Sequence, residues 1–364
     1  MSLSRARKAF NLEPVEGGFA LFELIAHPGM LEAASGISLY EFPRQSHAEA
    51  YKNLGVDFVL VLPDSASEFP DEQDTVELDD HGSRSARWGV GSGSVWASTL
   101  PFKSVEEVLE YDPFSCAAGT YPYCQDEDPH KSVDEIAAAQ QRGIDAQRQY
   151  AADHFLLPGG TIFVLFHYFI TTFGYNLFCD AALCHPVEFE KLLDRFAELS
   201  YKFSEAWAKT DIEVFIAHDD IAMNASTIFP PDWLRKHIFP RYKEILAPVQ
   251  RAGQKIIYFS DGDYTAVLDD LDEVKFDGYV FEPQMDLAMM IERYGGQKAI
   301  LGNVDVRVLT FGNNEDIRLE IDRCLNLGKD VPGYFLNVSG SIPQNVPLEN
   351  LQFYFEDIKR RRSG

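Results

Sequence analysis

Short runs of apolar residues recur along the chain, and each one ends at a polar or acidic residue. Eight runs fit this description: 19–26, 56–63, 161–166, 212–217, 255–260, 278–281, 299–302 and 333–338. Helical-looking stretches follow most of them. Apolar runs of about four to eight residues that alternate with amphipathic helices are typical of buried parallel strands joined by crossover helices. The pattern therefore predicts an α/β fold, a (β/α)₈ TIM barrel, which needs eight such units.

The helical stretches become regular after residue 131. We expect helices over 133–154, 186–208, 231–252, 314–327 and 348–361. Ser132 and the prolines at 186, 230 and 231 are typical helix-start residues. Residues 1–18 are expected to form a short lead-in, and residues 1–364 a single barrel domain.

An insertion interrupts this rhythm after the second predicted strand. Residues 65–130 are rich in Gly, Ser, Pro and Asp. Within them, 87–99 is typical of a glycine-containing hairpin, and Ser104 with Glu107 predicts the start of a helix over 104–111. Long insertions in compact domains often cover a binding site, so we expect 65–130 to form a lid beside the barrel mouth.

Composition and charge narrow the classes of partner. The hydrophobic content of 46% is ordinary for a globular protein, and no apolar run is long enough to predict a membrane span. Five cysteines without CxxC spacing, and a start without a signal-peptide core, indicate free thiols and a cytoplasmic protein. The net charge of −25 argues against nucleic acid and anionic membranes as partners. It favours a neutral or cationic small-molecule substrate.

Barrel enzymes place their chemistry at the carboxyl ends of the strands, where the polar residues that follow the runs would gather. The candidate catalytic residues are acidic: Asp64, Asp219, Asp220, Asp261 and Glu282. The candidates for substrate binding are His27, His167, Tyr168, His218, Asp263, Asn303, Asp305, Ser339 and, from the insertion, Trp88.

Each of these candidates also has a structural interpretation. Asp219 and Asp220 could form a pair in which one carboxyl group keeps a proton near neutral pH and acts as a general acid. Alternatively, one of them caps a helix or pairs with a base. Asp261 and Asp263 could belong to a turn, and Asp305 could cap a helix after the seventh strand.

Four segments resemble the uroporphyrinogen decarboxylase superfamily. They are 229–246, 259–264, 277–305 and 339–351, which read FPPDWLRKHIFPRYKEIL, FSDGDY, DGYVFEPQMDLAMMIERYGGQKAILGNVD and SGSIPQNVPLENL. The superfamily contains the decarboxylase and cobalamin-dependent methyltransferases that act on methylated thiols, methanol-derived methyl groups and methoxylated compounds. The resemblance implies a (β/α)₈ barrel, in agreement with the apolar runs.

Residues that match the decarboxylase's own site are few. Asp57 and Asp64 resemble its D-x₆-D spacing, and Tyr168 its active-site tyrosine. Its serine and its late histidine fall on Asp220 and Gly340, and its arginine-bearing RQAGRY signature is absent. Those arginines hold the substrate's carboxylates, and an acidic mouth would repel them. We therefore do not expect uroporphyrinogen as the substrate.

The thiol methyltransferases of the superfamily bind zinc through His-x-Cys and a later Cys. The matching positions here are Phe259, Asp261 and Gly340. Because thiol-activating zinc prefers Cys and His ligands, this site is not expected to hold it. Whether another metal binds is left open by the sequence.

The residues and the resemblance together favour a corrinoid-linked methyltransferase that demethylates a small O- or N-methyl compound. A separate protein would carry the corrinoid, and one acid among Asp219, Asp220, Asp261 and Glu282 would protonate the leaving heteroatom. One alternative is a decarboxylase for a smaller acid, with Asp64 retained for that reaction. Another is a non-catalytic relative that binds a corrinoid or another ligand. The sequence leaves open whether the protein forms a homodimer.

Overall fold

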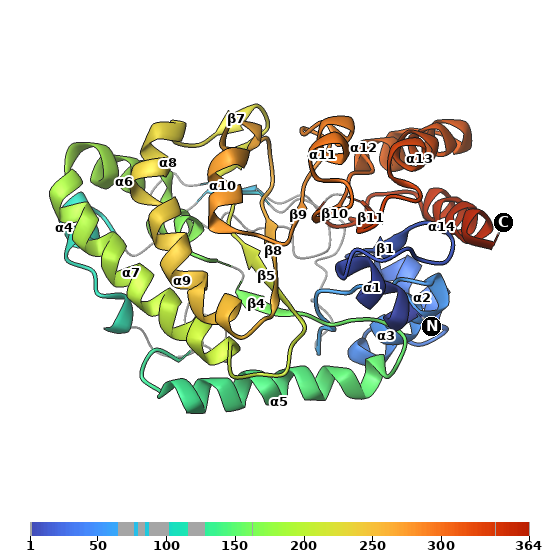
Figure 1. The fold of residues 1–364 in the computed structure, drawn as a ribbon, viewed down its shortest axis with the longest axis horizontal. Coiled ribbons are helices and arrows are strands. Elements are labelled where there is room, and N and C mark those ends of the chain that lie inside the picture. The colour runs from blue at the N-terminus through green and yellow to red at the C-terminus, as the bar shows by residue number, and fades with distance from the viewer. Residues whose placement is uncertain are drawn as a thin grey trace.

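The computed structural model describes residues 2–64, 76–78, 84–86, 102–115, 128–161, 163–338 and 340–363. Within them, seven parallel strands form one curled sheet in the order β1-β11-β10-β9-β8-β5-β4 (Figure 1). The strands are β1 (Ala20–Phe22), β4 (Gly159–Thr161), β5 (Val214–His218), β8 (Lys255–Phe259), β9 (Gly278–Val280), β10 (Ala299–Leu301) and β11 (Tyr334–Asn337). The predicted α/β barrel is confirmed.

The eighth position of the barrel is held by a single residue. Phe58 forms parallel bridges to Phe22 on one side and to Leu156, just before β4, on the other. The Val59 amide donates to the Leu156 carbonyl at 3.1 Å, which ties this segment to the β4 side. The run 56–63 therefore lies at the predicted place in the barrel. The prediction of a strand there is wrong, because the run forms only isolated bridges at Phe58.

The third predicted strand is also displaced. The run 161–166 was predicted as a strand, whereas β4 ends at Thr161 and helix α6 (Phe166–Cys184) begins at the other end of the run. The remaining runs form β1, β5, β8, β9, β10 and β11 within a few residues of the predicted bounds.

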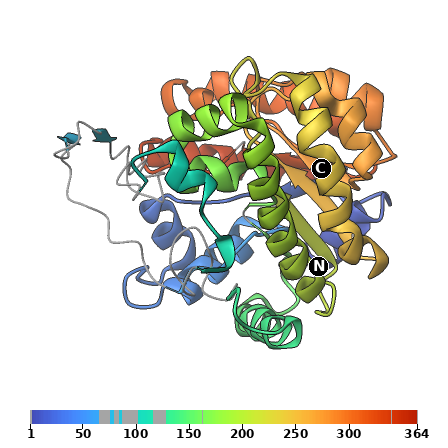
Figure 2. The same cartoon turned by 90° about the vertical axis from the view of Figure 1, so that its left-hand side faces the viewer.

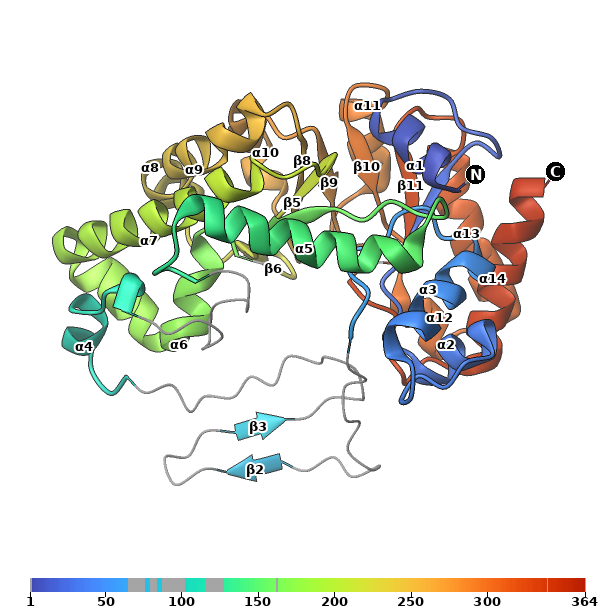
Figure 3. The same cartoon turned by 90° about the horizontal axis from the view of Figure 1, so that it is seen from below.

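Helices cover the outside of the barrel. They are α1 (Ser2–Phe10), α2 (Pro28–Ser35), α3 (Pro43–Leu54), α4 (Val105–Leu109), α5 (Val133–Ala151), α6, α7 (Pro186–Trp207), α8 (Pro231–His237), α9 (Phe239–Arg251), α10 (Leu268–Val274), α11 (Leu287–Tyr294), α12 (Val306–Phe311), α13 (Asn314–Gly328) and α14 (Leu348–Ser363). Helix α7 packs on β4, α9 on β8, α11 on β10 and α13 on β11. Figure 2 shows helices coloured green to orange around the outside of the strands. Helix α5 runs along one side in contact with α7 and α3 (Figure 3).

Helix α1 closes the amino-terminal end of the barrel. Its Phe10 ring lies 5.0 Å from the Phe58 ring and 4.6 Å from the Phe335 ring. Ala6 and Ala9 belong to the same buried cluster as the inward side chains of the strands. The predicted lead-in is therefore part of the core, and the opposite end of the barrel is the one open to a ligand.

Little of the insertion belongs to the described residues. The short strands β2 (Val76–Leu78) and β3 (Arg84–Ala86) pair antiparallel, while the predicted hairpin at 87–99 lies outside the described residues. Ser104 caps α4 by accepting the Glu107 amide at 3.4 Å, which confirms the predicted helix start. The expected lid function stays a prediction.

Candidate active site

Strand alternation decides which polar residues face the barrel interior. Inward side chains belong to one buried cluster that includes Val214 and Ile216 on β5, and Ile257 and Phe259 on β8. Since successive side chains of a strand point to opposite faces, the same face continues at the strand ends. The inward positions at the mouth are therefore His218, Asp220, Asp261 and Glu282.

Asp220 lies at the centre of this group. One of its carboxylate oxygens, Oδ1, lies 3.2 Å from Nε2 of His218 and accepts the Asp261 amide at 2.9 Å. The other, Oδ2, lies 3.2 Å from Nδ1 of His167. The side chains of Asp220, His167 and His218 are 18%, 14% and 27% exposed, so solvent still reaches all three. A carboxylate that faces two imidazoles is thus accessible at the mouth.

Aromatic rings support both histidines. The His167 ring stacks on Phe163 with 4.7 Å between centroids and 2° between planes. The His218 ring stacks on Phe259 at 4.5 Å and 21°. Phe259, which occupies a position where the superfamily's thiol methyltransferases have a zinc ligand, is therefore a packing surface for His218.

The charges of this group shift its acidities in opposite directions. Burial acts to raise the pKa of Asp220, but hydrogen bonds and charges of His167 and His218 outweigh it and hold that pKa below its usual range. Burial acts to lower the pKa of His218, but the hydrogen bond and charge of Asp220 raise it above the ordinary value. Asp220 is thus ionised, and its carboxylate faces both imidazole rings.

For Asp261 and Glu282, burial and neighbouring carboxylates outweigh the nearby positive charges. Asp261 is exposed at the mouth, but the protein atoms around its carboxyl group, together with the charges of Asp220 and Glu282, raise its pKa to about 7. Burial and Asp220 also raise the pKa of Glu282, against the opposing effect of the Gly262 amide that donates to its Oε2 at 2.8 Å. Asp261 is therefore a carboxyl group that exchanges a proton near neutral pH.

Asp219 faces the other side of the wall. Its Oδ2 accepts the amides of Leu165 and Phe166 at 2.7 and 2.8 Å and the hydroxyl of Tyr242 at 2.7 Å, and its Oδ1 accepts the His167 amide at 2.6 Å. Burial raises the pKa of Asp219, while the Tyr242 and amide hydrogen bonds lower it. Both oxygens are engaged, so Asp219 anchors the start of α6 and does not pair with Asp220. This anchor is also the reason that α6 begins where a strand was predicted.

Several other candidates hold the backbone at the mouth. His27 caps α2 by accepting the Met30 amide at 2.9 Å, and burial lowers its pKa. Asp305 caps α12 and pairs with Arg307 at 2.7 Å, which confirms its interpretation as a helix cap. Asp263 accepts the Thr265 amide at 2.9 Å within a turn.

The amide of Asn303 is likewise engaged inside the protein. Its Nδ2 donates to the carbonyls of Met285 and Glu282 at 2.8 and 3.3 Å, and its Oδ1 accepts from Arg323 at 3.0 Å. These contacts fix the loop that follows β9, the strand that presents Glu282. Asn303 therefore supports the site without offering a free polar atom to a ligand.

The remaining candidates lie apart from this group or outside the described residues. Asp64 has a 79% exposed side chain and pairs with Arg44 at 3.4 Å. Tyr168 is buried, with its ring 5.4 Å from Phe163 and 5.7 Å from Phe196. Ser339 and Trp88 lie outside the described residues.

Two residues of the site were not singled out from the sequence. Phe163, which stacks on His167, lies between β4 and α6. It was missed because the run 161–166 was predicted as a buried strand. Asn337 is fully buried at the end of β11, and the alternation from Phe335 places it inward. The alternation of the FLN segment was the available signal for Asn337.

Neither a metal centre nor a membrane-spanning helix is found in the part of the chain described. No group of three or more His, Cys, Asp or Glu side chains there is arranged to hold a metal ion. None of the described helices combines the length and the apolar character that crossing a bilayer needs. Cys179, Cys184 and Cys324 are free thiols, as expected, and Cys116 and Cys124 lie outside the described residues.

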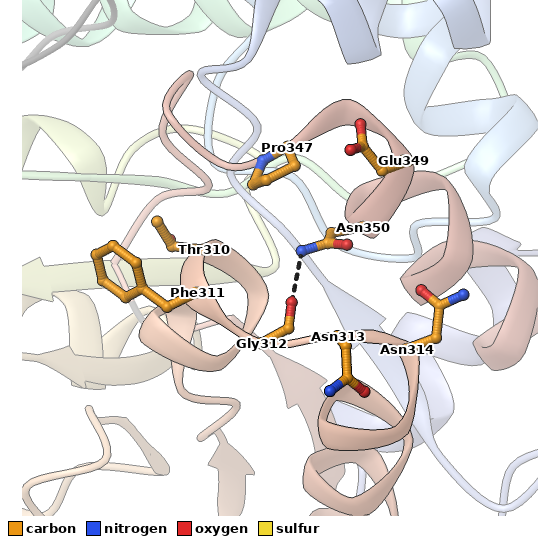
Figure 4. Close-up of a pocket in the computed structure, with 8 residues that line it drawn as sticks. All are labelled: Thr310, Phe311, Gly312, Asn313, Asn314, Pro347, Glu349 and Asn350. Atoms are coloured by element: carbon orange, nitrogen blue, oxygen red, sulfur yellow. Dashed lines mark hydrogen bonds between the residues drawn. The ribbon is translucent and has the colours of Figure 1, made fainter.

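A surface hollow between α12, α13 and α14 is separate from the barrel mouth. Figure 4 shows its lining, in which Asn350 donates to the Gly312 carbonyl at 3.0 Å. Phe311 at its rim is 83% exposed. None of the candidate residues lines this hollow, so the site rests on the polar group at the strand ends.

The parallel barrel and its inward carboxylate–imidazole group define an α/β-barrel protein with its polar site at the carboxyl ends of the strands. The family model described as uroporphyrinogen decarboxylase (URO-D) matches residues 159–361. The chain belongs to this family, which confirms the resemblance in its sequence.

Curated relatives match shorter stretches. The chain is 28% identical over 133 residues to uroporphyrinogen decarboxylase from Pelobacter propionicus, covering 36% of this chain and 38% of that protein. It is 24% identical over 180 residues to the enzyme from Trichodesmium erythraeum, covering 49% of each. The chain thus spans half or less of the length of these relatives.

A solved structure extends the likeness to the whole fold. A methyltransferase from Methanosarcina mazei is 17% identical and covers 99% of this chain and 98% of its own, with a TM-score of 0.64. At this identity the likeness establishes the fold alone.

Proposed function

We propose that the protein is a methyltransferase that removes a methyl group from the oxygen or nitrogen of a small compound and passes it to the corrinoid of a separate protein. The observation that carries the proposal is Asp261, an accessible carboxyl group whose pKa of about 7 keeps it partly protonated at neutral pH. Oxygen and nitrogen are poor leaving groups, and an acid with such a pKa suits their protonation.

The residues at the barrel mouth have separate roles in this proposal. Asp261 donates its proton to the heteroatom while the bond from the methyl carbon to that heteroatom breaks, and the electron pair of this bond stays on the heteroatom. The corrinoid, as co-substrate, supplies the nucleophile that takes the methyl group. Asp220 holds Asp261 through its backbone amide at 2.9 Å and keeps both imidazoles in place.

Charge supports a substrate other than the tetrapyrrole. Among the described residues near the strand ends, Arg307 pairs with Asp305 and Arg44 pairs with Asp64. Arg307 lowers the pKa of Glu282, but its guanidinium is held by the Asp305 carboxylate. The groups that face the mouth are Asp261 and Glu282. Bringing several substrate carboxylates beside these groups would be costly, because like charges in a poorly solvated site repel each other.

The test is methyl transfer to free cob(I)alamin with a panel of methoxylated and N-methylated compounds. We expect loss of the Co(I) absorbance band with at least one donor, and a rate that falls by roughly 10²-fold or more in Asp261→Asn, since general acid catalysis contributes about that factor. Asp64→Asn removes an equal charge outside the group and should leave the rate unchanged. A background rate with every donor would refute the proposal.

A decarboxylase for a smaller acid is the second candidate. The family match favours it, and a protonated Asp261 could protonate the carbanion left after carbon dioxide departs. Carbon dioxide release from a carboxylated substrate without any corrinoid would identify this activity. Cobalamin binding without turnover of either kind would instead identify a non-catalytic relative.

A further inference from the structure

The turn that follows β8 binds two carboxylates through consecutive backbone amides. The Asp261 amide donates to Oδ1 of Asp220 at 2.9 Å, and the Gly262 amide donates to Oε2 of Glu282 at 2.8 Å. Asp220 follows β5 and Glu282 follows β9, the two strands on either side of β8. The turn therefore holds a carboxylate from each neighbouring strand end, and the Asp261 side chain belongs to the same turn.

A short hairpin fixes this turn from a third segment. Strand β6 (Ala222–Met223) pairs antiparallel with β7 (Ser226–Thr227), and the Met223 carbonyl accepts the Asp263 amide at 2.9 Å. Residues 223–226 are exposed, so the hairpin lies at the surface. Three consecutive amides of the turn are thus engaged, each with a different segment of the chain.

The centre of the turn has room for glycine and for no larger residue. Gly262 has a φ of +77°, in the left-handed region where other residues are strained. A Cβ there would lie 2.4 Å from the Met223 carbonyl oxygen and 2.7 Å from its carbon. Both are backbone atoms, which cannot rotate aside as a side chain can. Any side chain at position 262 therefore pushes the turn and the hairpin apart.

The charged groups that act on Asp261 include the two carboxylates held by its own turn. Burial raises the pKa of Asp261, and so do the charges of Asp220 and Glu282. The imidazoles of His218, on β5, and His167, on α6, act in the opposite direction. A shift of the turn away from its hydrogen-bond partners therefore weakens the carboxylate charges that keep Asp261 protonated.

We infer that Gly262 is a positioning residue: its left-handed backbone without a side chain lets one turn hold two carboxylates and the hairpin at once, and so keeps the acid of the site in place. The inference rests on the proposed function, in which Asp261 is that acid. A side chain at position 262 moves the Asp261 carboxyl group away from its present neighbours. Asp261 then loses its proton at a lower pH and no longer lies where the leaving heteroatom needs it.

Gly253 provides a matched control. It lies in the connection from α9 to β8, at the opposite end of the barrel. Its φ is +76°, almost equal to that of Gly262, but a Cβ there would meet no atom within 4 Å. Alanine therefore brings the same backbone strain at both positions and a clash only at 262. Asparagine tolerates the left-handed region, so it reduces the strain at both positions and keeps the clash at 262.

The experiment compares Gly262→Asn with Gly253→Asn by two readouts. Carbon-13 NMR of protein labelled at the aspartate carboxyl carbons follows the titration of Asp261, which is identified by its absence in Asp261→Asn. We expect the midpoint to fall from about 7 towards the ordinary value of about 4 in Gly262→Asn, and to stay unchanged in Gly253→Asn. An unchanged midpoint in Gly262→Asn would overturn the inference, and so would an equal fall in Gly253→Asn.

Methyl transfer gives the second readout. A misplaced acid slows the chemical step more than it weakens substrate binding, so kcat at pH 7 should fall by roughly 10²-fold in Gly262→Asn with little change in KM. Gly253→Asn should keep both values. A rise in KM with kcat unchanged would contradict a role in positioning the acid.

A variant of the hairpin decides the question if Gly262→Asn does not fold. Ser226 is exposed and pairs with Met223, so Ser226→Pro disturbs the hairpin without altering the turn itself. The Asp261 midpoint should fall in this variant, and Ala225→Ser, an exposed change in the same hairpin, should leave it unchanged. An Asp261 titration that is unaffected by Ser226→Pro would overturn the inference.

The two proposals can fail separately. A lower Asp261 midpoint in Gly262→Asn, but no methyl transfer from any donor to the wild type, would support this inference and refute the methyltransferase. Methyl transfer at the same rate in Gly262→Asn and wild type, with the same Asp261 midpoint, would do the reverse.

Discussion

Asp219 and Asp220 are consecutive residues whose carboxyl groups face opposite sides of the barrel wall. Asp219 accepts the Tyr242 hydroxyl in the layer between sheet and helices, and Asp220 meets His218 at the mouth. A spacing of one residue in an extended chain separates two side chains across the wall, whereas residues on neighbouring strands come together. The acidic group of the site therefore comes from three strand ends: Asp220, Asp261 and Glu282.

The anchor role of Asp219 predicts a large effect on stability. Asp219→Ala leaves three backbone amides and the Tyr242 hydroxyl without an acceptor in a buried place, so the free energy of unfolding should fall by roughly 3–5 kcal/mol. Tyr242→Phe removes only one of these donors and should cost about 1 kcal/mol. Urea unfolding at pH 7 measures both. Equal effects of the two substitutions would contradict the anchor.

The raised pKa of Asp261 predicts how stability depends on pH. The folded protein holds this proton up to about pH 7, whereas the unfolded chain loses it near the ordinary value of about 4. The stabilisation from this group is thus complete below about pH 4 and is lost as the pH rises through 7. Asp261→Asn should therefore raise stability relative to wild type more at pH 8 than at pH 5.

Thermal unfolding at the two pH values measures that difference. Asp64→Asn removes an exposed carboxylate outside the group and serves as the control of equal charge. The methyl-transfer rate of the wild type should also decline above pH 7, as Asp261 loses the proton that it donates. A rate that rises through this range would contradict the role of Asp261 as an acid.

The contact between Asp220 and His218 predicts a shift in a histidine titration. Burial acts to lower the pKa of His218, and the charge and hydrogen bond of Asp220 raise it. Asp220→Asn removes that charge, so the pKa of His218 should fall. Proton NMR of the imidazole resonances over pH 5–9 follows this titration, and His27, which caps α2 away from Asp220, provides an internal reference. An unchanged His218 titration would show that Asp220 does not set it.

The contacts of α1 predict that the amino-terminal segment contributes to the stability of the barrel. Phe10→Ala removes a buried ring that packs on Phe58 and Phe335, so the free energy of unfolding should fall by roughly 3–5 kcal/mol. Lys8→Ala changes an exposed residue of the same helix and should stay within about 0.5 kcal/mol of wild type. Similar values for both would show that α1 is not part of the core.

The sequence predicted the barrel because its strands are continuous apolar runs, and such runs are hard to mistake when they are regularly spaced. It did not predict that Phe58 would form only bridges, since strand length depends on neighbours that lie far away in the chain. It also did not predict α6, because Phe166–Cys184 is apolar on several sides and lacks the periodicity of an amphipathic helix.

The sequence predicted that polar residues gather at the strand ends, and the structure groups several of them there. Whether each of these residues faces inward depends on the register of its strand. That register assigns Asp305 to a helix cap and Asp261 to the mouth, although both follow apolar runs. Asn337 was overlooked because an amide inside an apolar run has no distinctive pattern until its partners are known.

The pairing of β1 with β11 has a consequence for how the protein is made. The partner of Ala20 is Phe335, so β1 has a free apolar edge until the distant strand β11 has been synthesised. Asp57 also lacks one of its partners until late, because its carboxylate pairs with two arginines, Arg5 and the distant Arg362. Unpaired strand edges promote association between chains. The nascent polypeptide therefore exposes the edge of β1 until β11 emerges and the two strands pair.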